Sequence, residues 1–149
     1  MSRDGQGYFE GKIHVLPIRV YYEDTDLSGM VYHANYLRYM ERARTEFFRL
    51  AGVARMADLS ACEPTAWAIR EARIRYLKPA RLDDALTVRT ALLAMSGARV
   101  AATQKIYAGQ ALLVEGEVEA CIVTLKGRPR RLAGEHRRLL TAFLAETDT

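Results

Sequence analysis

The feature that most constrains the fold is a single change in hydrophobic period along the chain. Between residues 35 and 50 apolar side chains recur every three or four positions, whereas from residue 65 to residue 125 they alternate with polar ones. The first spacing predicts one long amphipathic helix, and the second predicts extended strands. Both apolar surfaces are buried if one face of an antiparallel sheet wraps a single long helix, which is an α+β architecture.

The predicted helix runs from about Asn35 to Leu50. Gly52 stands where a left-handed C-terminal cap is expected. The spacing places one apolar stripe along the helix, formed by Tyr36, Met40, Ala43, Phe47 and Leu50. A second, weaker helical turn is expected from Arg55 to Ser60, ahead of Pro64.

Strands are predicted on both sides of this helix. The first extends from His14 to Tyr22, with Pro17 marking an edge or early position in it. After residue 64 the sequence predicts a meander of four long strands, separated by turns at residues 78–84, 96–97 and 109–110. The phase of the alternation reverses near Arg70 and Glu71, which indicates a β-bulge there. A short helix closes the chain, with Leu139, Leu140, Phe143 and Leu144 as its apolar residues.

Composition narrows the class of protein. The 149 residues are expected to form one domain, 1–149, with residues 1–12 as a loose leader. Cys62 and Cys121 form neither a disulfide framework nor a pattern with zinc spacing, which favours a cytosolic setting. We find no apolar run of about 18 residues and no signal-peptide pattern, so no stable membrane insertion is expected.

The net charge of +4 is weak support for nucleic-acid binding, because arginines are spread along the chain without a basic face or stacking platform. We therefore expect no nucleic-acid partner. The one local excess runs from Lys126 to Arg138. It is interpreted either as a solvated surface or as a site for a small polyanion.

The segment from residue 21 to residue 36, YYEDTDLSGMVYHANY, is the unusual part of the sequence. Glu23, Asp24 and Asp26 place three carboxylates just before the helix start, with His33 close behind. Such residues commonly cap a helix, which explains one of them well but not all three. Alternatively, a carboxylate can attack a carbonyl or activate water while N–H groups at the helix start polarise the carbonyl oxygen. That combination is suited to acyl transfer.

The stretch RVYYEDTDLSGMVYHANYLRYMERARTEFFR, residues 19–49, closely resembles the YbgC branch of the 4-hydroxybenzoyl-CoA thioesterase family. The resemblance continues through YLKPARLDD, residues 76–84, and in element order over nearly the whole chain. It implies the hotdog fold, an antiparallel sheet wrapped around one long central helix. It also implies the hydrolysis of an acyl-CoA thioester to a free acid and CoA.

Matching the family motif residue by residue implies roles for several side chains. The catalytic carboxylate falls on Asp26, and the amide that would polarise the thioester carbonyl falls on His33. The remaining motif positions that would turn the loop or shape the pocket are Gly29, Tyr32, Asn35 and Tyr36. Leu27 departs from the small residue or Pro of close relatives, which could alter loop shape or acyl preference.

The resemblance also implies an assembly. Family members are dimers or dimers of dimers, which would make this chain a homodimer or homotetramer with part of each pocket supplied by the strand from Trp67 to Tyr76 of a neighbour. The family uses no metal or redox cofactor. Its YbgC branch is cytoplasmic and associated with the Tol–Pal envelope system, so envelope or lipid-synthesis proteins are possible partners.

Coenzyme A carries a 3′-phosphate and a pyrophosphate, which gives the basic segment a candidate ligand. We expect Lys126, Arg128 and Arg130 to contact these phosphates, with Arg73 and Lys78 behind them. The alternative is that the segment is only a solvated tail.

Two other functions remain open. Hotdog hydratases or dehydratases also pair Asp and His, but they usually place four residues including Pro between the two, whereas Asp26 and His33 are separated by six residues and no Pro. A non-catalytic acyl-CoA-binding module is the second alternative, and the intact Asp26 argues against it.

Overall fold

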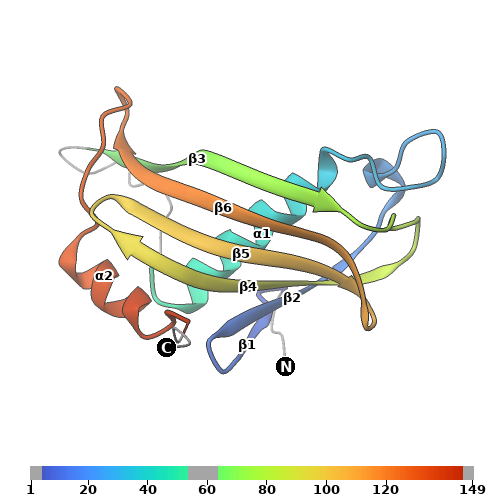
Figure 1. Cartoon of the computed structure of the whole chain (residues 1–149), viewed down its shortest axis with the longest axis horizontal. Helices are drawn as coiled ribbons and strands as arrows, with labels where there is room; N and C mark the ends of the chain where they lie inside the picture. The colour runs from blue at the N-terminus through green and yellow to red at the C-terminus, as the bar shows by residue number, and fades with distance from the viewer. Residues whose placement is uncertain (1–4, 54–63, 146–149) are drawn as a thin grey trace.

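A computed structural model describes residues 5–53 and 64–145, which form an antiparallel sheet with a long helix packed against one face (Figure 1). The described strands are β1 (Tyr8–Glu10), β2 (Ile13–Arg19), β3 (Thr65–Tyr76), β4 (Ala85–Ser96), β5 (Arg99–Ala108) and β6 (Ala111–Thr124). The described helices are the short 3-10 helix η1 (Tyr22–Asp24), the long α1 (Asn35–Leu50) and α2 (Gly134–Thr141). This is the α+β hotdog architecture expected above.

Helix α1 has the predicted bounds and buries one side against the sheet. Gly52 follows its end with a φ of +93°, as a left-handed cap requires. The buried face is wider than the predicted stripe, because Tyr39 and Phe48 are also covered, whereas Leu50 in the last turn is 38% exposed and was wrongly placed in the core. None of the helices in the described part of the chain is long and apolar enough to cross a membrane.

The order of strands differs from the predicted meander at one link. The sheet runs β1-β2-β4-β5-β6-β3, so β3 pairs with β6 and residues 77–84 cross over to β4 instead of forming a hairpin. That crossover passes the start of α1 and bonds to it. The Ala80 amide donates to the Tyr36 hydroxyl (3.0 Å), and the Ala80 carbonyl accepts the Val31 amide (2.9 Å). A hydrophobic pattern reports strands but not which of them become neighbours.

The bulge in β3 and the two hairpin turns lie where the sequence predicts them. The β3–β6 register shifts between Ile69 and Glu71, which is the expected bulge. The hairpins between β4 and β5 and between β5 and β6 turn at Gly97 and Gly109. Strand β2 ends at Arg19, however, and Tyr22 belongs to η1. The helical turn predicted at residues 55–60 lies outside the described residues.

The expectation of a loose leader through residue 12 is wrong for residues 8–10, which form β1 and pair with β2. The reason is packing at Phe9. Its ring stacks on Phe143 at a centroid distance of 4.3 Å and meets the edge of Phe47 at 5.0 Å. One aromatic side chain therefore joins β1, the end of α1 and the segment after α2.

A polar side chain is fully buried beneath the middle of α1. The Gln104 amide nitrogen donates to the Met40 carbonyl (2.9 Å) and to the Thr90 hydroxyl (3.0 Å), and its oxygen accepts a hydrogen bond from Arg44 (2.9 Å). Burial lowers the pKa of the Arg44 guanidinium. Every polar atom of the Gln104 side chain has a hydrogen-bond partner, so burying this side chain leaves no polar group unpaired. The Gln104 side chain can therefore fix the helix on the sheet without that energetic cost.

We expect Phe9→Ala to lower the free energy of unfolding by about 2 kcal/mol, because it removes a partly buried aromatic ring from contacts with the rings of His14, Phe47 and Phe143. Thermal or urea unfolding monitored by circular dichroism measures this. Glu10→Ala is the matched control, since it removes only the exposed ion pair with Arg89 (2.9 Å) and is expected to cost less than about 1 kcal/mol. If Phe9→Ala lowered the free energy of unfolding no more than Glu10→Ala does, the packing of Phe9 would contribute no measurable stability.

Candidate active site

The three carboxylates of the acidic loop lie in three different environments. Glu23 is exposed, Asp24 is buried with 5% of its surface accessible, and Asp26 is exposed on the turn that follows. None of them is the N-cap of α1, which is Ala34 and provides no side-chain hydrogen bond to the helix. The loop therefore separates one structural carboxylate from one that can meet a substrate.

Asp24 is the structural carboxylate. Its side chain accepts hydrogen bonds from the Tyr21 amide (2.8 Å) and the Asn35 side-chain amide (2.8 Å). Its backbone carbonyl accepts the Tyr32 amide (2.9 Å). The beginning of the loop is thereby tied to the first residues of α1.

Asp26 opens a tight turn that ends at Met30. The Gly29 amide donates to the Asp26 carbonyl (3.1 Å), and the Asp26 amide donates to the Met30 carbonyl (3.0 Å). Gly29 has a φ of +79°, a conformation that L-residues other than glycine adopt at a cost. Leu27 at the tip is fully exposed, so the larger side chain at this position leaves the turn intact.

Ser28 holds the Asp26 carboxylate in its charged form. The Ser28 hydroxyl and the Ser28 backbone amide (2.8 Å) both donate to the Asp26 Oδ1 oxygen. These two hydrogen bonds, the hydroxyl first, lower the pKa of Asp26, and the nearby His33 ring adds a smaller effect in the same direction. At neutral pH the group is a carboxylate, as a nucleophile or general base must be.

His33 lies two residues before α1, and its backbone amide donates to no acceptor among the described residues. Its ring contacts Tyr32 at a centroid distance of 4.6 Å, and its carbonyl accepts the Tyr76 hydroxyl (3.1 Å). An N–H group left without a partner at a helix start is suited to bind an oxygen that gains negative charge.

The other motif residues divide between surface and interior. Tyr32 is 49% exposed beside His33 and is accessible to a ligand. Asn35 and Tyr36 are buried, and their polar atoms are bonded to Asp24 and to the Ala80 amide, respectively. Burial raises the pKa of Tyr36. In the described part of one chain, these two residues support the loop from beneath.

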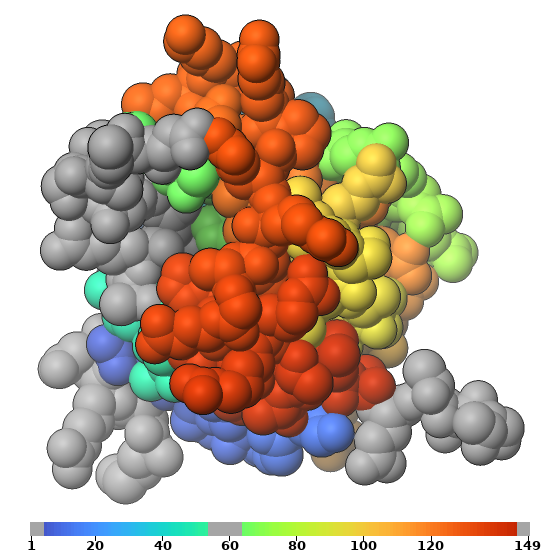
Figure 2. All heavy atoms as spheres, turned by 90° about the vertical axis from the view of Figure 1, so that its left-hand side faces the viewer, coloured from blue at the N-terminus to red at the C-terminus, as the bar shows by residue number. Residues whose placement is uncertain are grey.

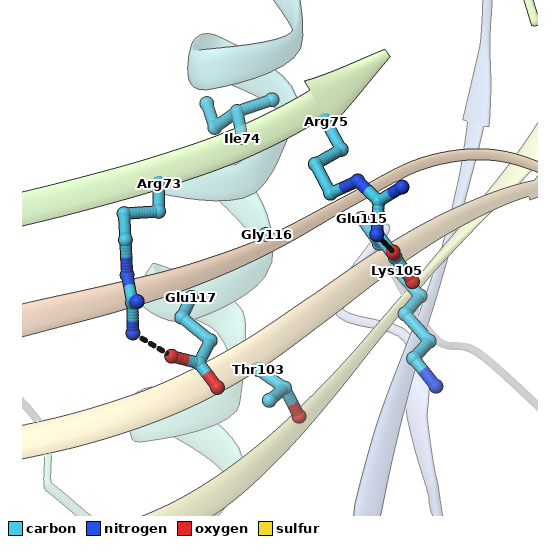
Figure 3. Close-up of a pocket in the computed structure, with 8 residues that line it drawn as sticks. All are labelled: Arg73, Ile74, Arg75, Thr103, Lys105, Glu115, Gly116 and Glu117. Atoms are coloured by element: carbon cyan, nitrogen blue, oxygen red, sulfur yellow. Dashed lines mark hydrogen bonds and ion pairs between the residues drawn. The ribbon is translucent and has the colours of Figure 1, made fainter. Parts of the chain in front are cut away.

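Arg73 lies on the face of the sheet opposite α1, in a shallow groove of about 550 Å³ (Figure 3). Its guanidinium pairs with Glu117 and Glu71, and Arg75 pairs with Glu115 in the same groove (3.3 Å). The structure does not bring Arg73 together with Asp26 on one surface of the chain.

Lys126, Arg128 and Arg130 are exposed in the segment that follows β6. They line a second groove, of about 520 Å³, together with Pro64 and Pro129. The segment lies at the left of Figure 1, whereas the acidic loop lies at the right, and Figure 2 shows the same segment projecting above α2. Within one chain these basic residues are thus at the opposite end of the sheet from Asp26.

Sequence reasoning assigned no role to Ser28 or Tyr76. Ser28 follows Asp26 by two residues, and that spacing is typical of a turn in which an aspartate accepts the backbone amide two positions ahead. Tyr76 reaches His33 from another strand, so no local pattern could reveal the contact. Among the described residues, no group of three or more His, Cys, Asp or Glu side chains could hold a metal ion.

Comparisons with known proteins identify the family of the chain. Residues 20–143 match the thioesterase-like superfamily. The chain is 44% identical over 118 residues to "Acyl-CoA thioester hydrolase YbgC" of Escherichia coli O6:H1, covering 78% of this chain and 87% of that protein. It is 38% identical over 114 residues to "Acyl-CoA thioesterase YbgC" of Haemophilus influenzae, covering 76% and 83%, respectively.

A solved structure extends the match to three dimensions. A probable thioesterase from Bartonella henselae has a TM-score of 0.76 and 38% identity, over 81% of this chain and 99% of that one. The fold and the site thus define a hotdog-fold thioesterase, an enzyme that acts on thioester bonds. Within that class the chain belongs to the YbgC family.

Replacing Ser28 with alanine is expected to raise the pKa of Asp26, because the hydroxyl that donates to the carboxylate is lost while the backbone amide remains. An NMR titration of the aspartate carboxyl carbons measures the shift. Ser28→Thr keeps the hydroxyl and serves as the control. An unchanged Asp26 titration in the alanine variant would contradict the assigned hydrogen bond.

Proposed function

We propose that this protein hydrolyses acyl-CoA thioesters to a free acid and CoA, with Asp26 and the His33 amide as the catalytic elements. The proposal rests on the exposed, charged carboxylate of Asp26, which stands on a tight turn. The loop that carries this turn is hydrogen-bonded to the start of α1, where the His33 amide donates to no described acceptor. The printed activities of the Escherichia coli and Haemophilus influenzae relatives support the same substrate class.

In the proposed reaction the thioester carbonyl oxygen accepts a hydrogen bond from the His33 amide, which makes the carbonyl carbon more electrophilic. The Asp26 carboxylate then either takes a proton from a water that attacks the carbon or attacks the carbon itself to form an anhydride that water opens. The carbon–sulfur bond breaks, and the thiolate of CoA leaves and is protonated. Both routes use the same charged oxygen, so both need Asp26 deprotonated.

The proposed active site is shared between two copies of the chain. Strand β3 forms one edge of the described sheet, and Ile69 and Tyr76 on it are 48% and 49% exposed. A long edge strand with exposed apolar side chains is a surface that normally pairs with another strand. Antiparallel pairing of two β3 edges about a two-fold axis gives a homodimer, and two such dimers give the homotetramer.

That pairing would bring the basic segment to the catalytic turn. Strand β3 is 12 residues long, or about 40 Å at about 3.3 Å per residue. One end carries Thr65, which pairs with Thr124, and the other carries Tyr76, which is bonded to His33. One bound CoA does not span this length. In a two-fold pair, however, the Thr65 end of one chain lies near the Tyr76 end of the other. Lys126, Arg128 and Arg130 of one copy would then meet the phosphates of CoA bound at Asp26 of the other.

The remaining features of the proposal come from the family resemblance and the chemistry. A carboxylate and water supply the whole reaction, so we propose no metal or redox cofactor. The proposed location is the cytoplasm, where acyl-CoA is available. Proteins of the Tol–Pal envelope system or of lipid synthesis are the proposed protein partners.

Replacing Asp26 with asparagine keeps the shape of the side chain and removes its charge. We expect kcat for CoA release to fall by two orders of magnitude or more, because general-base or nucleophilic catalysis of this kind contributes about 100-fold to 10,000-fold. A thiol reagent measures the released CoA across short, medium, long and aromatic acyl-CoAs. Glu23→Gln, an exposed carboxylate on the same loop, is the control and should retain wild-type kcat.

The same assay separates the two alternative functions. With an enoyl-CoA, loss of the conjugated double bond without thiol release would identify a hydratase. Binding of acyl-CoA without either signal would identify a non-catalytic binding module. Wild-type CoA release by Asp26→Asn would falsify the assignment of Asp26.

Arg128→Ala is expected to raise KM for acyl-CoA about tenfold and to change kcat little, because a charge-assisted hydrogen bond to phosphate contributes about 1.5–3 kcal/mol to binding. An acyl-pantetheine substrate, which lacks the nucleotide, should show the same KM with the variant and the wild type. Arg138→Ala, an exposed arginine on α2 at the same end of the chain, is the control. An equal rise in KM for both substrates would rule out a role in phosphate binding.

A further inference from the structure

Asp24 is a buried carboxylate that the proposed reaction does not use. It is 5% exposed and lies two residues before Asp26 on the same loop. No Lys or Arg side chain in the described ranges 5–53 and 64–145 forms an ion pair with it. A carboxylate without a cation is costly to bury unless hydrogen-bond donors replace its water, so its contacts must be specific.

The donors come from both sides of the catalytic loop. Oδ2 accepts the amide of Tyr21, which lies before η1, and Oδ1 accepts the side-chain amide of Asn35, the first residue of α1. The Tyr32 amide donates to the Asp24 carbonyl. Asp24 is thus bonded to residues on either side of the His33 peptide, one position before it and two positions after it.

A buried tyrosine of α1 lies next to the contact between Asp24 and Asn35. Tyr39, one turn along α1 from Asn35, is fully buried, and burial followed by the neighbouring Asp24 carboxylate raises the pKa of its hydroxyl. The hydroxyl itself lies outside hydrogen-bond geometry with any described acceptor. Arg42 lies over the outer face of the Tyr39 ring at 5.9 Å. Asp24 and Asn35 therefore form a buried polar contact that lies beside the buried side chain of Tyr39.

The segment between the two anchored ends is short and internally bonded. Thr25 and Val31 form an antiparallel bridge, and inside it the Asp26 amide donates to the Met30 carbonyl. The loop that carries Asp26 is thus bonded internally, and the side-chain hydrogen bond from Asn35 to Asp24 joins it to the first residue of α1.

We propose that Asp24 is a positioning residue, which through Asn35 holds the Asp26 carboxylate and the His33 amide at the separation that attack on a bound thioester requires. This inference rests on the proposed function, because it assigns Asp24 a part in that reaction. Asp24 touches neither the substrate nor the reacting atoms. Its effect is on kcat, since misplacement of a catalytic group by about 1 Å can cost about 100-fold in rate.

The test exchanges the two side chains. Asp24→Asn leaves one acceptor oxygen where Tyr21 and Asn35 both donate, and Asn35→Asp sets two carboxylates facing each other. In the double variant the new amide at position 24 accepts the Tyr21 amide and donates to the new carboxylate at position 35. We expect each single variant to lose about 10-fold to 100-fold in kcat, with KM changed by less than about threefold, and the double variant to recover kcat to within about threefold of wild type.

Each variant is also examined by thermal unfolding, and kcat is expressed per folded protein. A merely structural contact would lower the midpoint of unfolding and leave kcat per folded molecule unchanged, which would overturn the proposal. If the single variants do not fold, the double variant alone decides: wild-type stability with less than about a tenth of wild-type kcat would also overturn it. Glu23→Gln should match wild type in both measurements.

Asp26→Asn separates this inference from the proposed function. Loss of activity in Asp26→Asn together with wild-type kcat in Asp24→Asn would refute the positioning role and leave the proposed function intact. Wild-type activity in Asp26→Asn would refute the proposed function itself, whatever Asp24→Asn does.

Discussion

The packing of α1 against the sheet is the constraint on which the rest of the structure depends. Gly116 on β6 makes the close approach possible, because a Cβ atom there would lie 3.0 Å from the Met40 Cε atom and 3.0 Å from the Arg73 carbonyl. Gln104 then fixes the helix lengthwise by donating to the Met40 carbonyl. Since the amide of His33 belongs to the start of this helix, the packing of the middle of α1 also decides where the proposed catalytic donor stands.

Asp24 and Asp26 are chemically identical side chains that differ in their surroundings. Asp24 and Asp26 are two residues apart, yet one is enclosed with amide donors and the other faces solvent with a serine hydroxyl beside it. Burial normally disfavours a carboxylate, and hydrogen bonds to the charged form favour it. In this loop the hydrogen bonds at Asp24 join separate backbone segments, whereas those at Asp26 lower its pKa and so favour its charged form.

Local patterns in the sequence account for the elements and for part of the site. The period of 3.6 residues defined α1 from Asn35 to Leu50, and the reversed alternation located the bulge after Ile69. Strand order escaped prediction, because the pairing of β3 with β6 depends on contacts across 38 or more residues. Phe9 was missed for the same reason: its partners Phe47 and Phe143 are distant in the chain.

The site shows the same division between local and long-range information. Asp26, Gly29 and His33 lie within one continuous motif and were found from it, whereas the contact of Tyr76 with His33 spans 43 positions. The motif also could not show that Asn35 faces inward, whereas the helical period had already placed Tyr36 on the buried stripe. Nor could the motif show that the basic residues near Arg128 stand at the far end of the sheet, since that follows from the length of β3.

The open edge of β3 bears on how the protein behaves in solution. Among the described residues β3 pairs on one side only, with β6, so its other side offers unpaired backbone N–H and C=O groups to any other extended chain. If two copies normally cover this edge for each other, assembly protects the protein against aggregation. A variant that blocks the pairing would then be lost first to precipitation and proteolysis, before any deficit in turnover could be measured.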